Sequence, residues 1–165
     1  MRIKQTLFTL LLLFVFSFSF GQYRSSIGGI FGKEGYGLSY KQFIQPEQNI
    51  EVNFLYRKPG GGQVVALFQF FKEINNATLH TRNLSWSFGL GVHAGYWQEN
   101  PLGYKTGGNK SIGVDGVLGL EYYFGVIPFT LGAQLRPYWE YRTNTINEPQ
   151  DYLDISIMIR YIIAD

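Results

Sequence analysis

The stretch that decides the fold is Ser111-Ile112-Gly113-Val114-Asp115-Gly116-Val117-Leu118-Gly119-Leu120-Glu121-Tyr122-Tyr123-Phe124. Apart from Gly116, its even-numbered positions carry apolar or aromatic side chains, whereas both carboxylates, Asp115 and Glu121, fall on odd-numbered positions. A two-residue period is the pattern of a β-strand with one apolar face and one polar face. The run is longer than the roughly 5–6 residues of a typical strand, and it suits the roughly 9–11 residues that cross a bilayer at a tilt. It therefore predicts a wall with an apolar outside and a polar inside.

The same alternation recurs along most of the chain. We expect strands at about 24–32, 36–44, 50–57, 64–71, 84–97, 111–124, 129–141 and 153–163. Turn residues such as Pro59-Gly60-Gly61-Gly62 separate them. The pattern predicts an all-β fold, an antiparallel up-and-down transmembrane β-barrel of about eight strands. If the barrel starts on the periplasmic side, its longest connection, 98–110, lies outside the cell, where it could meet an extracellular partner.

The first residues have the features of a cleavable signal peptide. A basic start, Met1-Arg2-Ile3-Lys4, precedes an apolar run over 7–18, and Ser19-Phe20-Gly21 provides small residues for cleavage before Gln22. We therefore expect a signal peptide at 1–21, a barrel domain at 22–165 and export to the bacterial outer membrane. A retained single-span anchor is the alternative, although the apolar run is shorter than the roughly 20 residues that a spanning helix needs.

Charge and cysteine content exclude several classes of function. Without Arg2 and Lys4 the 14 Lys and Arg residues become 12, which equals the 12 Asp and Glu residues. A mature chain of zero formal charge has no basic excess for nucleic acid, so no nucleic-acid partner is expected. The chain has no cysteine, which excludes disulfides and thiolate chemistry.

The inward face of the predicted barrel is charged but nearly balanced in sign. The interior of an eight-stranded barrel is just wide enough to be filled by side chains, so we expect a plugged cylinder and not an open pore. The predicted ion-pair network of this lumen comprises Lys41, Glu51, Arg57, Asp115, Glu121, Arg136, Glu140, Asp154 and Arg160. Buried charges persist when they are paired or hydrogen-bonded. Asp115 and Glu121 are best matched to inward arginines such as Arg136 and Arg160.

Catalytic and metal-binding interpretations have weaker support in the sequence. Asp115 and Glu121 could be read as paired catalytic carboxylates, but an ion-paired core explains them as well. His93 falls on the predicted lumen face and His80 in a turn, and neither has an obvious serine or acidic partner beside it. The glycines at 113, 116 and 119 lie within a strand, whereas a nucleotide-binding loop needs a strand, a turn and a helix. We expect no catalytic residue, no cofactor, no metal and no enzymatic activity.

Aromatic residues near the predicted strand ends suggest a membrane boundary. Tyr and Trp favour the membrane–water interface, where the ring is in contact with lipid and its polar edge stays hydrated. The predicted interface aromatics are Tyr56, Trp86, Tyr96, Trp97, Tyr122, Trp139, Tyr141 and Tyr161. Some of them could instead be core aromatics of a soluble barrel.

The run 113–122, followed by Ile127-Pro128, Arg136-Pro137 and the closing Ile159-Arg160-Tyr161, resembles small outer-membrane β-barrel proteins of the Bacteroidota. Phe20-Gly21-Gln22 is similar to the end of their signal peptides. The resemblance implies an eight-stranded barrel of OmpX or OmpA type, and it carries over no catalytic residue. It also implies contact with outer-membrane lipid and lipopolysaccharide, insertion by the barrel-assembly machinery, and a monomer.

Three classes of function follow. The first is a non-enzymatic outer-membrane protein with a structural or surface-interaction role in the cell envelope. The second is a secreted or periplasmic lipocalin-like barrel that binds a small apolar ligand; this class predicts charged residues at outward positions such as 112, 114, 118 and 120, where the chain has Ile, Val, Leu and Leu. The third is a lipid-modifying barrel enzyme that depends on His93. A conducting channel has the least support.

Overall fold

The computed structural model describes residues 25–57, 60–74, 83–97, 109–143 and 152–164. The regular elements in this part of the chain are eight strands: β1 (Ser25–Gly32), β2 (Tyr36–Gln45), β3 (Gln48–Arg57), β4 (Gly61–Glu73), β5 (Leu84–Trp97), β6 (Asn109–Tyr123), β7 (Phe129–Arg142) and β8 (Leu153–Ala164). The predicted strand count is confirmed, and the predicted bounds agree to within a few residues. None of the described residues forms a helix long and apolar enough to span a bilayer. The predicted signal peptide, 1–21, lies outside the described residues.

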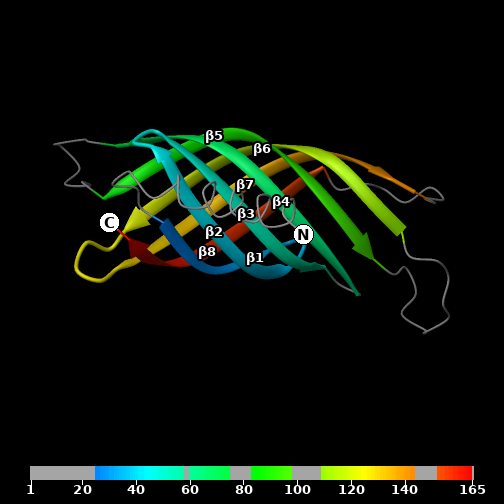
Figure 1. Ribbon diagram of the computed structural model, residues 1–165, viewed down its shortest axis with the longest axis horizontal. Coiled ribbons are helices and arrows are strands. Elements are labelled where there is room, and N and C mark those ends of the chain that lie inside the picture. Colours follow the sequence, from blue (N-terminus) through cyan, green and yellow to red (C-terminus); the bar gives the residue numbers. More distant parts are fainter. Residues whose placement is uncertain (1–24, 58–59, 75–82, 98–108, 144–151, 165) are drawn as a thin grey trace, which may run out of the picture.

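The strands form one closed antiparallel barrel in which each strand pairs with the next and β1 pairs with β8 (Figure 1). Ile27 in β1, for example, is opposite Tyr40 in β2 and Tyr161 in β8. The β1–β8 register is regular except for a shift at Ser25 and Ser26. Closure leaves no strand edge free to pair with another chain.

The connections alternate between the two ends of the barrel. We call the end with connections 33–35, 58–60, 98–108 and 143–152 the loop end. The opposite end, where β1 starts and β8 finishes, has connections 46–47, 74–83 and 124–128, and we call it the turn end. The long connection 98–108, part of the predicted extracellular loop, lies outside the described residues.

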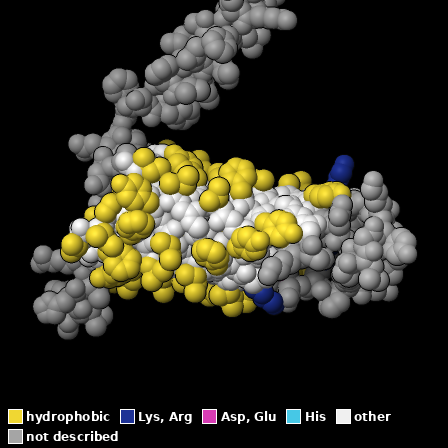
Figure 2. All heavy atoms as spheres, turned by 90° about the horizontal axis from the view of Figure 1, so that it is seen from below, with side chains coloured by type: hydrophobic (Ala, Val, Ile, Leu, Met, Phe, Trp, Pro, Cys, Tyr) yellow, Lys and Arg dark blue, Asp and Glu magenta, His cyan; other side chains and the backbone are white. Residues whose placement is uncertain are grey.

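The two faces of the wall differ as the alternation in β6 predicts. Ile112, Val114, Leu118 and Leu120 are between 52% and 62% exposed, whereas Asp115, on the opposite face of the same strand, is 2% exposed. On the face of the barrel that Figure 2 shows, hydrophobic side chains are spread over most of its length. The prediction of an apolar outside is therefore confirmed.

The interior contains an apolar layer as well as charges. Ile30, Leu55, Val65, Leu67, Val117 and Met158 form a buried cluster. Along β3, β6 and β8 the apolar residue stands between a charged residue toward the loop end and another toward the turn end. The expectation of an ion-paired polar core thus needs correction: the interior has three layers, and the middle layer is apolar.

Candidate functional site in the barrel interior

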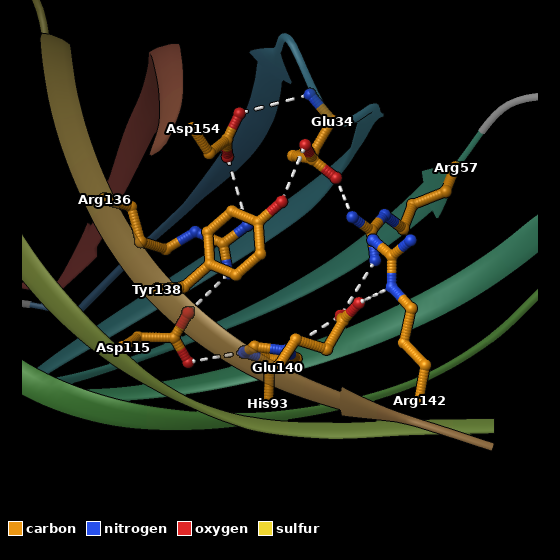
Figure 3. A network of polar contacts seen from close by, with 9 residues as sticks. All are labelled: Glu34, Arg57, His93, Asp115, Arg136, Tyr138, Glu140, Arg142 and Asp154. Atoms are coloured by element: carbon orange, nitrogen blue, oxygen red, sulfur yellow. Dashed lines mark hydrogen bonds and ion pairs between the residues drawn. The ribbon is translucent and has the colours of Figure 1, made fainter. Parts of the chain in front are cut away.

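The charges nearer the loop end form one connected cluster, which we call the loop-end network (Figure 3). Its members are Glu34, Arg57, His93, Asp115, Arg136, Tyr138, Glu140, Arg142 and Asp154. They come from the β1–β2 connection and from strands β3, β5, β6, β7 and β8. Alternation places the side chains of the strand residues inside, and antiparallel pairing brings the strands together.

Arg136 is the centre of one half of this network. Its guanidinium donates from Nη1 to Asp115 Oδ1 at 2.9 Å and from Nη2 to Asp154 Oδ2 at 3.1 Å. The backbone N–H of Glu34 donates to the second oxygen of Asp154 at 3.1 Å. Asp154 therefore ties the β1–β2 connection to the wall of the barrel.

Arg57 and Glu140 hold the other half together. Arg57 forms an ion pair with Glu34, and its Nη1 lies 3.2 Å from Glu140 Oε2. Arg142 Nε donates to the other oxygen of Glu140 at 2.5 Å. Tyr138 donates its hydroxyl to Glu34 Oε1 at 3.0 Å, and its ring lies 5.4 Å from the Arg136 guanidinium, so it contacts both halves.

His93 lies between two carboxylates in the middle of the network. Its Nδ1 is 2.8 Å from Asp115 Oδ2, and its Nε2 is 3.0 Å from Glu140 Oε2. All three side chains have 0% exposure. His93 has no acidic neighbour in the sequence, and its two carboxylate partners come from β6 and β7, 22 and 47 residues away.

Hydrogen bonding at both ring nitrogens of His93 requires a bound proton. A neutral imidazole has one N–H donor and one acceptor nitrogen, so it can donate to only one of two carboxylates. Both contacts are hydrogen bonds only when the His93–Asp115–Glu140 trio holds one extra proton, on the imidazole or on a carboxyl group. The described network has four carboxylates and three guanidinium groups. A protonated His93 makes the charges equal.

Gly113 creates the space that His93 occupies. It lies opposite His93 in the β5–β6 ladder and opposite Glu140 in the β6–β7 ladder. A Cβ atom at this position would overlap the His93 ring and the backbone carbonyl of Trp139. The glycine is explained by this close approach, not by phosphate binding.

The second cluster lies nearer the turn end, and we call it the turn-end network. Its charged members are Lys41, Glu51, Glu121 and Arg160. Arg160 contacts Glu51 Oε2 at 2.8 Å and Glu121 Oε2 at 3.0 Å, and Lys41 Nζ lies 2.6 Å from Glu121 Oε2. Two cations thus face two carboxylates, with no excess of either sign.

Neutral side chains add hydrogen bonds to the turn-end network. Glu51 accepts from Asn53 at 2.8 Å and from Gln69 and Gln134 at 3.2 Å. Arg160 Nε donates to Ser39 Oγ at 2.9 Å. These bonds offset the cost of removing the charges from water.

The structure brings the nine predicted lumen residues into two networks, not one. The pairings Asp115–Arg136 and Glu121–Arg160 are those that the sequence favoured. Sequence reasoning missed Glu34 and Arg142, which lie in a connection and at a strand end, where alternation is hard to read. It also missed Tyr138, although this residue shares the inward face of β7 with Arg136.

The predicted interface aromatics fall into two groups at opposite ends of the barrel. Near the loop end lie Tyr56, Tyr96, Trp139 and Tyr141, and near the turn end lie Trp86, Tyr122 and Tyr161. Their exposed fractions run from 38% at Trp86 to 60% at Tyr141. The side chain of Trp97 lies outside the described residues. The assignment of these residues to a membrane boundary stays a prediction.

Each charged side chain of the two networks has a partner of opposite charge. Both ring nitrogens of His93 are occupied by carboxylates, so neither is free to activate a nucleophile. His80 lies outside the described residues. Among the described residues, no group of three or more His, Asp or Glu side chains is arranged to hold a metal ion. The geometry is that of structural ion pairs.

These features define a class of protein: a closed eight-stranded antiparallel barrel with an apolar outside and an ion-paired inside. Comparison with known protein families and with curated proteins finds no match for the sequence. The fold is similar to the crystal structure of the N-terminal β-barrel domain of OprF from Pseudomonas aeruginosa, with a TM-score of 0.63. The two share 12% sequence identity over 86% of this chain and 98% of that chain. At this identity the likeness concerns the fold alone.

Proposed function

We propose that this chain is an integral outer-membrane β-barrel protein without enzymatic activity, related to the small barrels of the Bacteroidota. Its interior is plugged, and its role in the envelope is structural or consists of interactions made by its extracellular loops. In this proposal the segment 1–21 directs export, and the barrel-assembly machinery inserts the chain as a monomer into a membrane of phospholipid and lipopolysaccharide.

The observation that carries this proposal is the inverted distribution of charge. Exposed charged side chains among the described residues are Lys33, Glu47, Lys72, Glu73 and Lys110, all in connections or near strand ends. The outward positions between them are apolar or uncharged, while the remaining charges point inward. Exposing such a surface to water is unfavourable, whereas contact with the hydrocarbon of a membrane is favourable.

The height of the apolar surface supports a membrane location. From Ile112 to Tyr122, β6 advances ten residues, or about 33 Å at roughly 3.3 Å per residue. With a strand tilt of about 40°, this length rises about 25 Å along the barrel axis, which equals the apolar band of outer-membrane barrels. The two groups of aromatic residues lie near the limits of this band.

The layered interior supports a closed cylinder. On β3, β6 and β8 a buried apolar residue lies between the charges of the loop-end network and those of the turn-end network, and passing a buried apolar group is unfavourable for an ion. We therefore expect planar-bilayer recording of the folded protein to show no single-channel steps. Regular steps at low voltage would refute the plugged interior.

Two other functions have less support. A soluble lipocalin-like barrel would place charged residues on the outside, and Ile112, Val114, Leu118 and Leu120 occupy those positions. A lipid-modifying enzyme would need a reactive group that reaches the lipid, whereas His93 is buried between two carboxylates. Measuring deacylation or acyl transfer on lipopolysaccharide with His93→Ala tests the enzymatic alternative directly.

The proposal is tested by membrane extraction and by gel mobility. We expect alkaline carbonate to leave the mature protein in the outer-membrane fraction. We also expect unboiled protein to migrate differently from boiled protein in dodecyl sulfate, because closed barrels resist the detergent until heated. Release by carbonate together with identical mobility of the two samples would refute the membrane location.

A further inference from the structure

The connection between β6 and β7 has an exposed apolar tip. It runs Phe124-Gly125-Val126-Ile127-Pro128, and we call it the β6–β7 turn. Val126 is 94% exposed, and Ile127 and Phe124 are 48% and 41% exposed. From 122 to 135 the chain has no Asp, Glu, Lys, Arg or His. An apolar tip of this kind is unfavourable if it projects into water.

Backbone hydrogen bonds hold the tip in place. Val126 N–H donates to the carbonyl of Phe124 at 2.8 Å, and Phe129 N–H donates to the carbonyl of Ile127 at 2.7 Å. Gly125 has φ 71°, a left-handed conformation that favours glycine. The Pro128 carbonyl accepts from Ile162 N–H at 2.8 Å, which fixes the turn to β8. The turn therefore presents its apolar side chains in a defined position.

The tip continues the apolar outside of the barrel. The rings of Tyr122 and Phe124 meet edge to face with centroids 5.3 Å apart, and those of Phe129 and Tyr161 do so at 5.4 Å. The apolar surface thus passes without a polar break from the outward faces of β6, β7 and β8 onto the turn. Figure 2 shows hydrophobic side chains reaching this end of the barrel.

The β2–β3 connection at the same end is different. It contains Pro46 and the exposed Glu47, and it has no large apolar side chain. A charged turn belongs in water, whereas an apolar turn at the same end belongs at least partly in lipid. The boundary of the apolar environment therefore lies farther out on the β6–β7 side than on the β2–β3 side.

We propose that the β6–β7 turn is a lipid-binding element that inserts Val126 and Ile127 into the headgroup–acyl boundary of the phospholipid leaflet at the turn end. This inference rests on the proposed membrane location and deepens it. The occupant is phospholipid, because the turn continues the lipid-facing surface and offers no charge or exposed hydrogen-bonding side chain to a protein partner. At the turn end, the β6–β7 side of the barrel then reaches deeper into the bilayer than the β2–β3 side.

The absence of cysteine from the chain allows single-cysteine labelling to test this proposal. Val126→Cys, Leu118→Cys and Glu47→Cys are each labelled with an environment-sensitive fluorophore and refolded into phosphatidylcholine vesicles, with gel mobility as the folding check. Leu118 is the control for the lipid-facing wall, and Glu47 is the control for a turn in water. Fluorescence is then quenched separately by brominated lipid and by aqueous iodide.

We expect the label at Val126 to be quenched by brominated lipid, as at Leu118, and to show about threefold less iodide quenching than the label at Glu47. Equal iodide quenching at Val126 and Glu47, with lipid quenching at Leu118, would overturn the inference and leave the membrane location intact. Protection of Val126 from both quenchers would overturn it in favour of a protein contact. Iodide quenching without lipid quenching at Leu118 would instead refute the proposed membrane location.

Discussion

Replacing Arg160 by methionine tests whether the interior networks are balanced units. Arg160 has 0% side-chain exposure and is the cation of Glu51, while Glu121 has a second cation in Lys41. The substitution keeps much of the buried volume but leaves two carboxylates with one cation. Glu51 would then retain only amide donors.

The expected loss in the free energy of unfolding follows from the number of charges left unpaired. Breaking a buried pair by removing one partner costs about 3–5 kcal/mol, because the other charge stays buried without compensation. We expect a loss of this size in the free energy of unfolding for Arg160→Met. Adding Glu51→Gln restores the balance, with Lys41 facing Glu121, so the double variant should regain about 2 kcal/mol of the loss.

The measurement is urea unfolding of the protein in lipid vesicles, followed by tryptophan fluorescence and by the gel mobility of unboiled samples. Lys72→Met is the matched control, because Lys72 is exposed near the end of β4, and we expect a change within about 0.5 kcal/mol. If Arg160→Met behaved like this control, or if Glu51→Gln made it less stable still, the idea of a balanced network would be wrong.

Three further predictions concern the trio, the close approach and the outer wall. His93→Gln should cost about 1–3 kcal/mol in the same assay, because an amide donates from its nitrogen alone, so Asp115 or Glu140 loses the hydrogen bond that His93 donates and keeps only its arginine partners; no loss would show that the trio holds no extra proton. Gly113→Ala should cost about 1–3 kcal/mol, since its Cβ overlaps the His93 ring. Gly62→Ala, whose Cβ would lie 3.9 Å from its nearest neighbour, should be neutral, and equal effects at the two glycines would contradict this reasoning. Leu118→Arg should destabilise the barrel in vesicles by about 2–4 kcal/mol, whereas a barrel that faces water would tolerate it.

Much of the fold was predictable because one physical rule governs each strand. Side chains alternate across a pleated sheet, so the sequence of β6 assigns Asp115 and Glu121 to one face and Leu118 and Leu120 to the other. The same rule correctly placed the nine predicted lumen residues inside the barrel. The pairings of Asp115 with Arg136 and of Glu121 with Arg160 could be favoured because the charges are opposite and the side chains share the lumen.

The contacts of His93 were not predictable in the same way. Its partners, Asp115 and Glu140, are 22 and 47 residues away, and only the register of β5, β6 and β7 brings them together. The apolar middle layer was missed for a related reason: alternation shows that Leu55 and Val117 face inward, but not that they lie at one height. Height depends on the stagger between strands, which a single strand does not encode.

The two interior networks also join the first two strands and their connection to strands β6 and β8. Arg160 donates to Ser39 across 121 residues, the Glu34 backbone donates to Asp154 across 120 residues, and Lys41 reaches Glu121 across 80. None of these contacts exists in an open sheet, because each needs β1 and β2 beside β8 or opposite β6. By contrast, Arg136 contacts Asp115 and Asp154 on the two strands that flank β7. The last four strands can therefore pair charges among themselves, whereas the contacts of Ser39, Glu34 and Lys41 with β6 and β8 form only in the closed cylinder.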